Sequence, residues 1–379
     1  MEEPLSSIKK LRHELHSLAE VSNKEKTTAE FVRDFLKRTN PDSLIEDIGG
    51  HGLAAVYEGK ETGPTVMIRS ELDALPIPET INLEYKSITD GIAHKCGHDG
   101  HMAIVCGIAE KLYEHPQKKG RVVLLFQPAE ETGEGAAQIL DDARFKTIAP
   151  DYVFALHNLP GYAEGEIVVK DGVFASASRG LIIKLKGKTS HAGHPEDGIS
   201  PALAAASLIQ GLTALPVLHT ALHNAAMVTI IHARVGEIAF GTTPGYAEVM
   251  ATLRAYQKDD MEILIKKALE LTEGISMANN LKYETAWTEI FEANINDKKC
   301  VQMIKAAAAA NGIKSRVIKN PFPWSEDFGR FTQEYPGAIF GIGAGSEHPQ
   351  LHNSNYDFPD SILPTGITMF NSIIRGILG

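Results

Sequence analysis

The sequence predicts an α/β protein with an open sheet, helices on both faces of that sheet, and a smaller inserted domain. The chain has 379 residues, which exceeds the size at which a single core stops growing. Short β-rich runs alternate with helical patterns along most of the chain. Between residues 179 and 289 this alternation gives way to the pattern of a self-contained unit.

The larger domain is predicted to begin with two amphipathic helices, at residues 6–20 and 24–38, because apolar residues recur there at helical spacing. Short strands then alternate with further helices. The predicted strands are 52–57, 64–69, 121–127, 151–156 and 337–342, and the further helices are 103–115 and 361–378. An open sheet covered on both faces has this element order.

The smaller domain is predicted to have the β-α-β-β-α-β order of a ferredoxin-like fold. Its elements are strand 180–186, helix 201–215, strands 226–234 and 247–256, helix 260–279 and strand 281–288. We therefore expect one domain made of residues 1–178 and 291–379, with residues 179–290 inserted into it.

Composition and charge argue against several classes of protein. The formal net charge is −11, and no long Lys/Arg run offers a basic face to nucleic acid. No apolar run is long enough to span a bilayer, and residues 1–10 lack the apolar core of a signal peptide. Three cysteines at irregular positions do not make a disulfide framework. We expect a soluble, cytoplasmic protein that binds a small molecule or peptide, with no nucleic acid or membrane partner.

Four polar clusters are predicted near strand ends or ahead of helices, where open sheets bind ligands. They are 96–101 ahead of the 103–115 helix, 128–131 after strand 121–127, His157-Asn158 after strand 151–156, and His352-Asn353 after the last strand. A thiolate, imidazoles and a carboxylate together suit zinc, and carboxylate-rich sites also accept manganese. If the clusters converge, they can form a metal site.

Each cluster also has a purely structural interpretation. A short Cys-x-His motif often occurs by chance, and His157 can be a core histidine at a strand end. Glu130 and Glu131 can be a solvated helix start stabilised by the helix dipole. The metal hypothesis is favoured because all four clusters can lie at the same edge of one sheet, which the structural interpretations do not require.

Seven motifs occur in the order found in a known family. They are RSELDALP at 69–76, CGHD at 96–99, FQPAEE at 126–131, ALHN at 155–158, SHA at 190–192, SEDF at 325–328 and LHN at 351–353. With them, nearly the whole chain resembles the M20 metallopeptidase family. The similarity is to the amidohydrolase branch, which includes aminoacylases, N-acyl amino acid deacetylases and auxin-conjugate hydrolases. The resemblance implies a zinc-peptidase-like catalytic domain on the open sheet, with the inserted domain serving as a lid and dimerisation domain.

The resemblance also implies a centre for two divalent metal ions. Cys96 would bridge the ions, with His98 and His157 on one ion and Glu131 and His352 on the other. Manganese or zinc is the expected metal, and nickel or cobalt also fit a mixed S/N/O ligand set.

Two residues receive catalytic roles from the resemblance. Glu130 would be the general base, taking a proton from a metal-bound water whose pKa is lowered toward neutrality. His191 would reach the site of the partner subunit and stabilise the oxyanion, which implies a homodimer joined through the inserted domains. Its alternative is a surface-loop histidine. Asp73 would orient a ligand from outside the ligand set, or would simply form a turn before Ala-Leu-Pro.

The chain departs from the family pattern at two positions. Gly241 stands where the family commonly has a substrate-binding Asn, and Glu71 stands where Asp is usual. Substrate recognition is therefore expected to differ from that of the better-known relatives. Arg254 can pair with a substrate carboxylate or form a structural ion pair, and the sequence leaves both open.

The expected reaction is metal-dependent hydrolysis of the amide bond of an N-acyl amino acid or a small N-acylated peptide. One alternative is a di- or tripeptidase of the same family, which needs a site for a free ammonium group. Another is an inactive binding protein, which predicts a broken ligand set. A thiol-nucleophile enzyme using Cys96 is the last alternative, and it would remain active after chelation.

Overall fold

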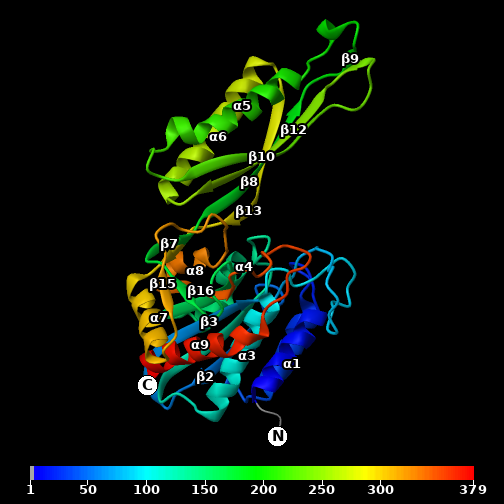
Figure 1. Cartoon of the computed structure of the whole chain (residues 1–379). Helices are drawn as coiled ribbons and strands as arrows, with labels where there is room; N and C mark the ends of the chain where they lie inside the picture. Colours follow the sequence, from blue (N-terminus) through cyan, green and yellow to red (C-terminus); the bar gives the residue numbers. More distant parts are fainter. Residues whose placement is uncertain (1–3) are drawn as a thin grey trace. The chain divides into compact units, whose positions relative to one another are not determined.

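The computed structural model describes residues 4–379, and the chain divides into two compact units (Figure 1). Unit 1 comprises Met1–Phe174, Asn294–Pro321 and Glu326–Gly379. Unit 2 comprises Ala175–Ala293 and Phe322–Ser325. The range 179–290, predicted as the inserted domain, falls within unit 2, and its role as a lid and dimerisation domain stays a prediction.

Unit 1 is built on an eight-stranded sheet with the order β1-β2-β4-β3-β5-β16-β6-β15. Its strands are β1 (Ser43–Ile48), β2 (Gly52–Glu58), β3 (Glu61–Glu71), β4 (Lys119–Gln127), β5 (Tyr152–Pro160), β6 (Ile167–Val169), β15 (Ser315–Val317) and β16 (Gly337–Gly345). The four central strands β4, β3, β5 and β16 are parallel neighbours. Their carboxyl ends therefore lie at the same edge of the sheet.

Helices cover both faces of this sheet, as predicted. One core cluster joins the sheet to α1 (Pro4–Ser17), α2 (Lys26–Lys37), α3 (His98–Glu114), α7 (Lys298–Ala310) and α9 (Leu363–Leu378). The shorter α4 (Gly135–Asp141) and α8 (Gly329–Glu334) contact β4 and β16. Consecutive residues such as Val122 and Val123 are both fully buried, although only Val122 belongs to that core cluster. Burial on both faces explains why these strands are continuous apolar runs.

The remaining short elements of unit 1 connect the main ones. The 3-10 helices η1 (Ala143–Thr147) and η3 (Asp360–Ile362) precede β5 and α9, and β14 (Asn294–Asn296) pairs with β7 (Gly172–Ala175). The strands β1, β6 and β15 were not predicted. β6 and β15 have three residues each, and only the last residue of β1 is buried, so none shows a clear hydrophobic period.

Unit 2 has the predicted β-α-β-β-α-β order. Its elements are β8 (Ala177–Lys186), α5 (Ala202–His219), β10 (Ala226–Val235), β12 (Tyr246–Ala255), α6 (Lys258–Ala278) and β13 (Lys282–Phe291), and the sheet order is β10-β12-β8-β13. A small ribbon pairs β9 (Ser190–His191) with β11 (Thr242–Thr243), and η2 (Pro195–Asp197) follows β9. α5 has the length and apolar composition to cross a membrane. Within the described residues it contacts β10, β12 and α6, and 33% of this stretch is buried.

Several sequence-based boundaries differ from the structure, and two of them bear on the site. α3 begins at His98, so residues 98–101 form its first turn and do not precede it. Gly97 has a φ of 95°, a conformation that glycine adopts without strain, and it turns the chain directly into the helix. β5 continues to Pro160, so His157 and Asn158 lie inside the strand, where they pair with β16. This pairing extends beyond the apolar run from which the strand was predicted.

Candidate metal centre

Side chains that can bind metal meet at the carboxyl edge of the parallel strands, in two groups that share Cys96. Candidate ligand atoms of Cys96, His98 and His157 lie within 4.8 Å of one another, and so do those of Cys96, Glu131 and His352. Cys96 lies two residues before α3 and His98 is its first residue, His157 comes from β5, Glu131 from the turn after β4, and His352 from the loop after β16. The structure thus brings together all five residues predicted as ligands.

Backbone carbonyls orient two of the histidines. His98 Nδ1 donates to Asp73 O, and His157 Nδ1 donates to Asn158 O, each at 2.8 Å. A carbonyl can only accept, so Nδ1 carries the proton and Nε2 presents a lone pair in the neutral ring. His157 Nε2 lies 3.5 Å from Cys96 Sγ, and the buried His98 Nε2 has no hydrogen-bond partner. A buried nitrogen left in this way fits a metal ligand.

Asp73 contacts one residue of each group. Its Oδ1 lies 3.4 Å from His98 Nδ1, and its Oδ2 accepts the backbone N–H of Glu131 at 3.0 Å. Ser22 Oγ donates to the same Oδ2 at 2.7 Å. The side chain of Asp73 is fully buried, so these contacts can hold His98 and Glu131 in fixed positions relative to each other.

Consecutive glutamates at the turn after β4 have different partners. Glu130 Oε1 accepts the backbone N–H of Asp327 at 3.3 Å, and Glu130 Oε2 lies 3.9 Å from His98 Nε2. Glu131 Oε2 lies 3.7 Å from His352 Nε2. The preceding Ala129 has a φ of 50°, an uncommon conformation for a residue with a side chain. Glu130 belongs to neither of the two groups that share Cys96, but its carboxylate lies within 4.8 Å of candidate ligand atoms of His98 and Glu131.

Negative charge is crowded in this buried cluster. Burial and the nearby carboxylates of Glu326 and Glu131 raise the pKa of Glu130 well above its usual value. Burial, with the charge of Asp73, raises the pKa of Glu131 to about 7, and burial raises the pKa of the Cys96 thiol. Glu130, Glu131 and Cys96 have too little positive charge around them. A bound divalent cation would supply the missing positive charge. The donor set therefore fits divalent metal ions.

Arg69 neutralises the carboxylates on the sheet side of the cluster. The buried guanidinium pairs with Glu71, with Glu326 at 3.0 Å and with Asp327 at 2.6 Å. Glu71 also bonds His101 Nδ1 at 2.8 Å. Arg69 and His101 lower the pKa of Glu71 despite its burial. Glu71 is thus an ionised structural partner, a role that sequence reasoning missed; the alternating charges of the RSELD motif were the available signal.

Unit 2 contains the other predicted catalytic residue. His191 is exposed in β9, and its Nδ1 accepts the backbone N–H of Gly193 at 3.0 Å. A side chain at Gly241 would meet nothing within 4 Å, so packing within the described residues does not require glycine there. Arg254 donates to Ser325 Oγ at 2.8 Å and lines a cavity of about 150 Å³ with Tyr256.

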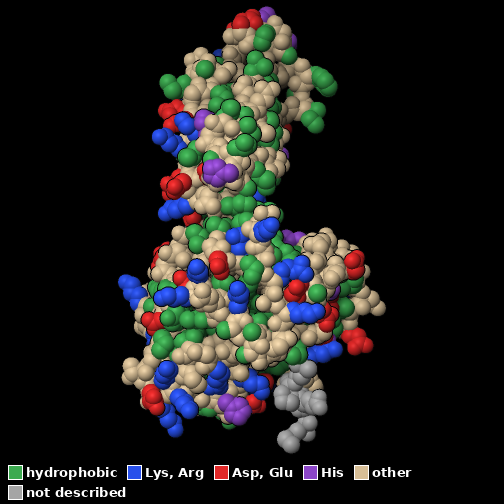
Figure 2. Space-filling model, turned by 60° about the vertical axis from the view of Figure 1, so that its left-hand side comes forward, with side chains coloured by type: hydrophobic (Ala, Val, Ile, Leu, Met, Phe, Trp, Pro, Cys, Tyr) green, Lys and Arg blue, Asp and Glu red, His purple; other side chains and the backbone are tan. Residues whose placement is uncertain are grey.

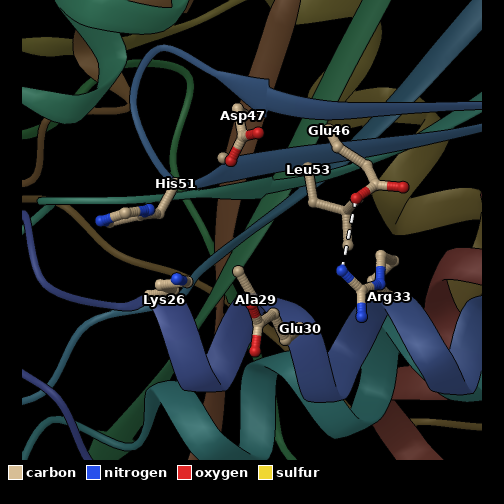
Figure 3. A pocket seen from close by; sticks show the side chains of 9 residues that line it. Lys26, Ala29, Glu30, Arg33, Glu46, Asp47, His51 and Leu53 are labelled. Carbon is tan, nitrogen blue, oxygen red and sulfur yellow. Dashed lines mark hydrogen bonds and ion pairs between the residues drawn. The ribbon is translucent and has the colours of Figure 1, made fainter.

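A second polar pocket lies between α2 and the β1–β2 turn (Figure 3). Its volume is about 340 Å³, and it is lined by the charged residues Lys26, Glu30, Arg33, Glu46 and Asp47 and by His51. Arg33 pairs with Glu46 at 3.4 Å, and charges of both signs line the cavity. It therefore indicates no particular ligand. Lys and Arg are also interspersed with Asp and Glu on the face drawn in Figure 2.

Comparisons with known proteins identify the family. The model for peptidase family M20/M25/M40 matches residues 67–376. An N-acetylcysteine deacetylase of Bacillus subtilis is 31% identical, with 90% of this chain and 89% of the relative covered. A hippurate hydrolase of Campylobacter jejuni is 30% identical, with 94% and 92% covered. A dinuclear metal-binding peptidase of the M20 family from B. subtilis has a TM-score of 0.83 and 27% identity, covering 99% of this chain and 98% of its own.

These matches confirm the predicted α/β fold and the predicted hydrolase class, and they support a centre for two divalent ions. The residues matched by the family model include all five ligand-type residues and Glu130. The two relatives align over about nine-tenths of both chains. The chain therefore belongs to peptidase family M20/M25/M40.

Proposed function

We propose that this chain hydrolyses the amide bond of N-acyl amino acids or small N-acylated peptides. The observation that carries the proposal is the pair of ligand groups that share Cys96, with Glu130 beside them. Relatives named N-acetylcysteine deacetylase and hippurate hydrolase support this substrate class. An inactive binding protein is disfavoured, because that interpretation predicts a broken ligand set.

The five ligand-type residues divide between the two ions. Cys96, His98 and His157 hold one, and Cys96, Glu131 and His352 hold the other. When bound, the ions supply a water of lowered pKa and polarise the amide carbonyl. Manganese or zinc is the proposed metal, with nickel or cobalt as further candidates.

Glu130 moves the proton during the reaction. Its carboxylate takes a proton from the attacking water and delivers it to the leaving amine. The backbone N–H of Asp327 holds one carboxylate oxygen, which leaves the other oxygen, near His98, available for proton transfer.

We also propose that the protein is a cytoplasmic homodimer joined through unit 2. β10 is an edge strand and carries the exposed apolar residues Met227, Ile231 and Val235. An exposed apolar edge strand is a template for pairing with another chain. The neighbouring α5 exposes Val217 and Leu218. In such a dimer, His191 stabilises the oxyanion in the site of the partner subunit.

The proposed reaction is tested by amine release from N-acetyl, N-aroyl and long-chain N-acyl amino acids and from dipeptides. Manganese-reconstituted protein is compared with the same protein after chelation. We expect turnover of one acyl class, abolished by chelation and restored by metal. Preferred cleavage of dipeptides would instead identify a peptidase, and activity that survives complete chelation would point to Cys96 as a nucleophile.

Glu130→Gln should keep both metal ions and lose about 10²–10⁴-fold in kcat, because the amide fills the same space but cannot accept a proton. Steady-state kinetics with metal analysis of the same preparation measures both quantities. Glu164→Gln, which changes an exposed carboxylate, is the matched control and should behave as wild type. Substantial residual turnover in Glu130→Gln would remove Glu130 from the role of base.

Cys96→Ala should lower the metal content, because the thiolate shared by both ligand groups is lost. Cys106→Ala removes another buried thiol, on α3 but outside the cluster, and should retain both ions. Metal content per folded chain is measured after dialysis. Full occupancy in Cys96→Ala would show that the bridge is assigned to the wrong residue.

His191→Ala should lower kcat by about 10²–10³-fold if it removes an oxyanion donor, whereas His194→Ala, in the same exposed segment, should not. Mixing inactive His191→Ala and Glu130→Gln chains tests whether His191 acts across the dimer. Hybrid dimers then contain one intact site, and random exchange recovers about a quarter of wild-type activity. No recovery despite demonstrated subunit exchange would rule out action in the partner's site.

A further inference from the structure

A fully buried lysine contacts two of the segments that carry the ligand-type side chains. Lys95 precedes Cys96 in the chain, and its side chain is completely inaccessible to solvent. Its Nζ donates to Tyr356 O at 2.7 Å and also pairs with Glu79. Its backbone carbonyl accepts the N–H of His352 at 2.8 Å. One residue therefore contacts both ends of the 352–356 turn.

That turn needs such contacts, because His352 has a φ of 62°. A residue with a side chain is strained in this left-handed region, and the strain persists only when surrounding contacts hold it. Thr80 N donates to Ser354 O at 3.1 Å. The segment that contains Glu79, the partner of Lys95, therefore also binds the middle of the turn. The His352 side chain itself is about half exposed, at 52%, and its own packing constrains it little.

A chain of buried polar contacts fixes the lysine in turn. Glu79 accepts from His16 Nε2 at 3.0 Å, and His16 Nδ1 contacts Asp99 at 2.7 Å. Arg12 pairs with Asp99 at 3.0 Å and with Asp357, the residue after Tyr356. The contacts thus run from Lys95 through α1 and α3 and return to the loop that carries His352. Buried charges in such a chain hold their partners tightly, since an unpaired member is costly.

We propose that Lys95 is a positioning residue that fixes His352 as a ligand and thereby sets the affinity of one of the two metal ions. This inference rests on the proposed function, because it takes Cys96, Glu131 and His352 as the ligands of that ion. The histidines of the other ion, His98 and His157, are held directly by the carbonyls of Asp73 and Asn158. Lys95 reaches them only indirectly, through Tyr356, whose hydroxyl donates to Asn158 Oδ1. Lys95 contacts neither substrate nor metal.

The test is a titration of metal-free protein with Mn²⁺ or Zn²⁺ alone, resolving two dissociation constants for wild type, Lys95→Met and His352→Ala. Lys95→Met should weaken one ion by about 10- to 100-fold, the usual effect of removing a residue that supports a ligand, and leave the other within a few-fold. Lys111→Met, which removes a partly exposed lysine paired with Glu114 on α3, is the matched control and should leave both constants unchanged.

A double-mutant cycle separates positioning from a merely structural effect. If Lys95 acts through His352, adding Lys95→Met to His352→Ala produces little further loss of affinity. Additive losses, or equal weakening of both ions, would overturn the proposal. Unchanged binding in Lys95→Met, while His352→Ala loses an ion, would overturn it and leave the proposed ligand set intact. No loss in His352→Ala would show that the ligand set itself is wrong.

Glu79→Gln provides a second variant if Lys95→Met does not fold. The amide oxygen still accepts from Lys95, but the charge that holds the ammonium group is gone. The same ion should then bind several-fold more weakly, with circular dichroism confirming the fold. Two unchanged dissociation constants in Glu79→Gln would count against a positioning role for Lys95.

Discussion

The common direction of β4, β3, β5 and β16 is the constraint on which the rest of the site depends. Parallel neighbours end at the same edge of a sheet, and segments far apart in the chain therefore deliver their side chains to one place. Glu131 follows β4, His157 lies in β5, and His352 follows β16. The loop from β3 leads to Cys96 and to α3, which packs on the sheet. An antiparallel arrangement of these strands would send neighbouring strand ends to opposite edges.

Charge balance is the second requirement, because unit 1 buries several ionisable groups near this edge of the sheet. Arg69 offsets Glu71, Glu326 and Asp327, while Lys95 and Arg12 offset Glu79, Asp99 and Asp357. Such pairs are expensive to desolvate and are seldom a source of stability. Here they hold the segments that carry the ligand-type side chains. Within the described residues, Glu130 and Glu131 have histidines but no Lys or Arg partner near them, and they lie at the proposed metal centre.

The residues with proposed roles are divided between the two units. All five ligand-type residues and the proposed base belong to unit 1, so the proposed metal centre draws on that unit alone. Unit 2 carries His191, Gly241 and Arg254, for which roles toward substrate or oxyanion are proposed or were expected from the sequence. This division allows specificity to change through unit 2 while the ligand set stays constant. This division is consistent with the sequence of the chain, which carries the seven family motifs but has Gly241 where the family pattern has Asn.

The sequence by itself determined the fold class, the order of the main elements and the family, because hydrophobic periodicity and motif order are local properties. The motifs also predicted the five ligand residues and Glu130, whose side chains the structure places together; their roles in binding and catalysis stay predictions. Only the tertiary structure decided that α3 begins at His98, that β5 extends through His157, and that short strands complete the sheet. It also decided the partners of Glu71 and Lys95. A buried charged residue has the same local sequence as a solvated one, and only long-range packing determines which groups neutralise it.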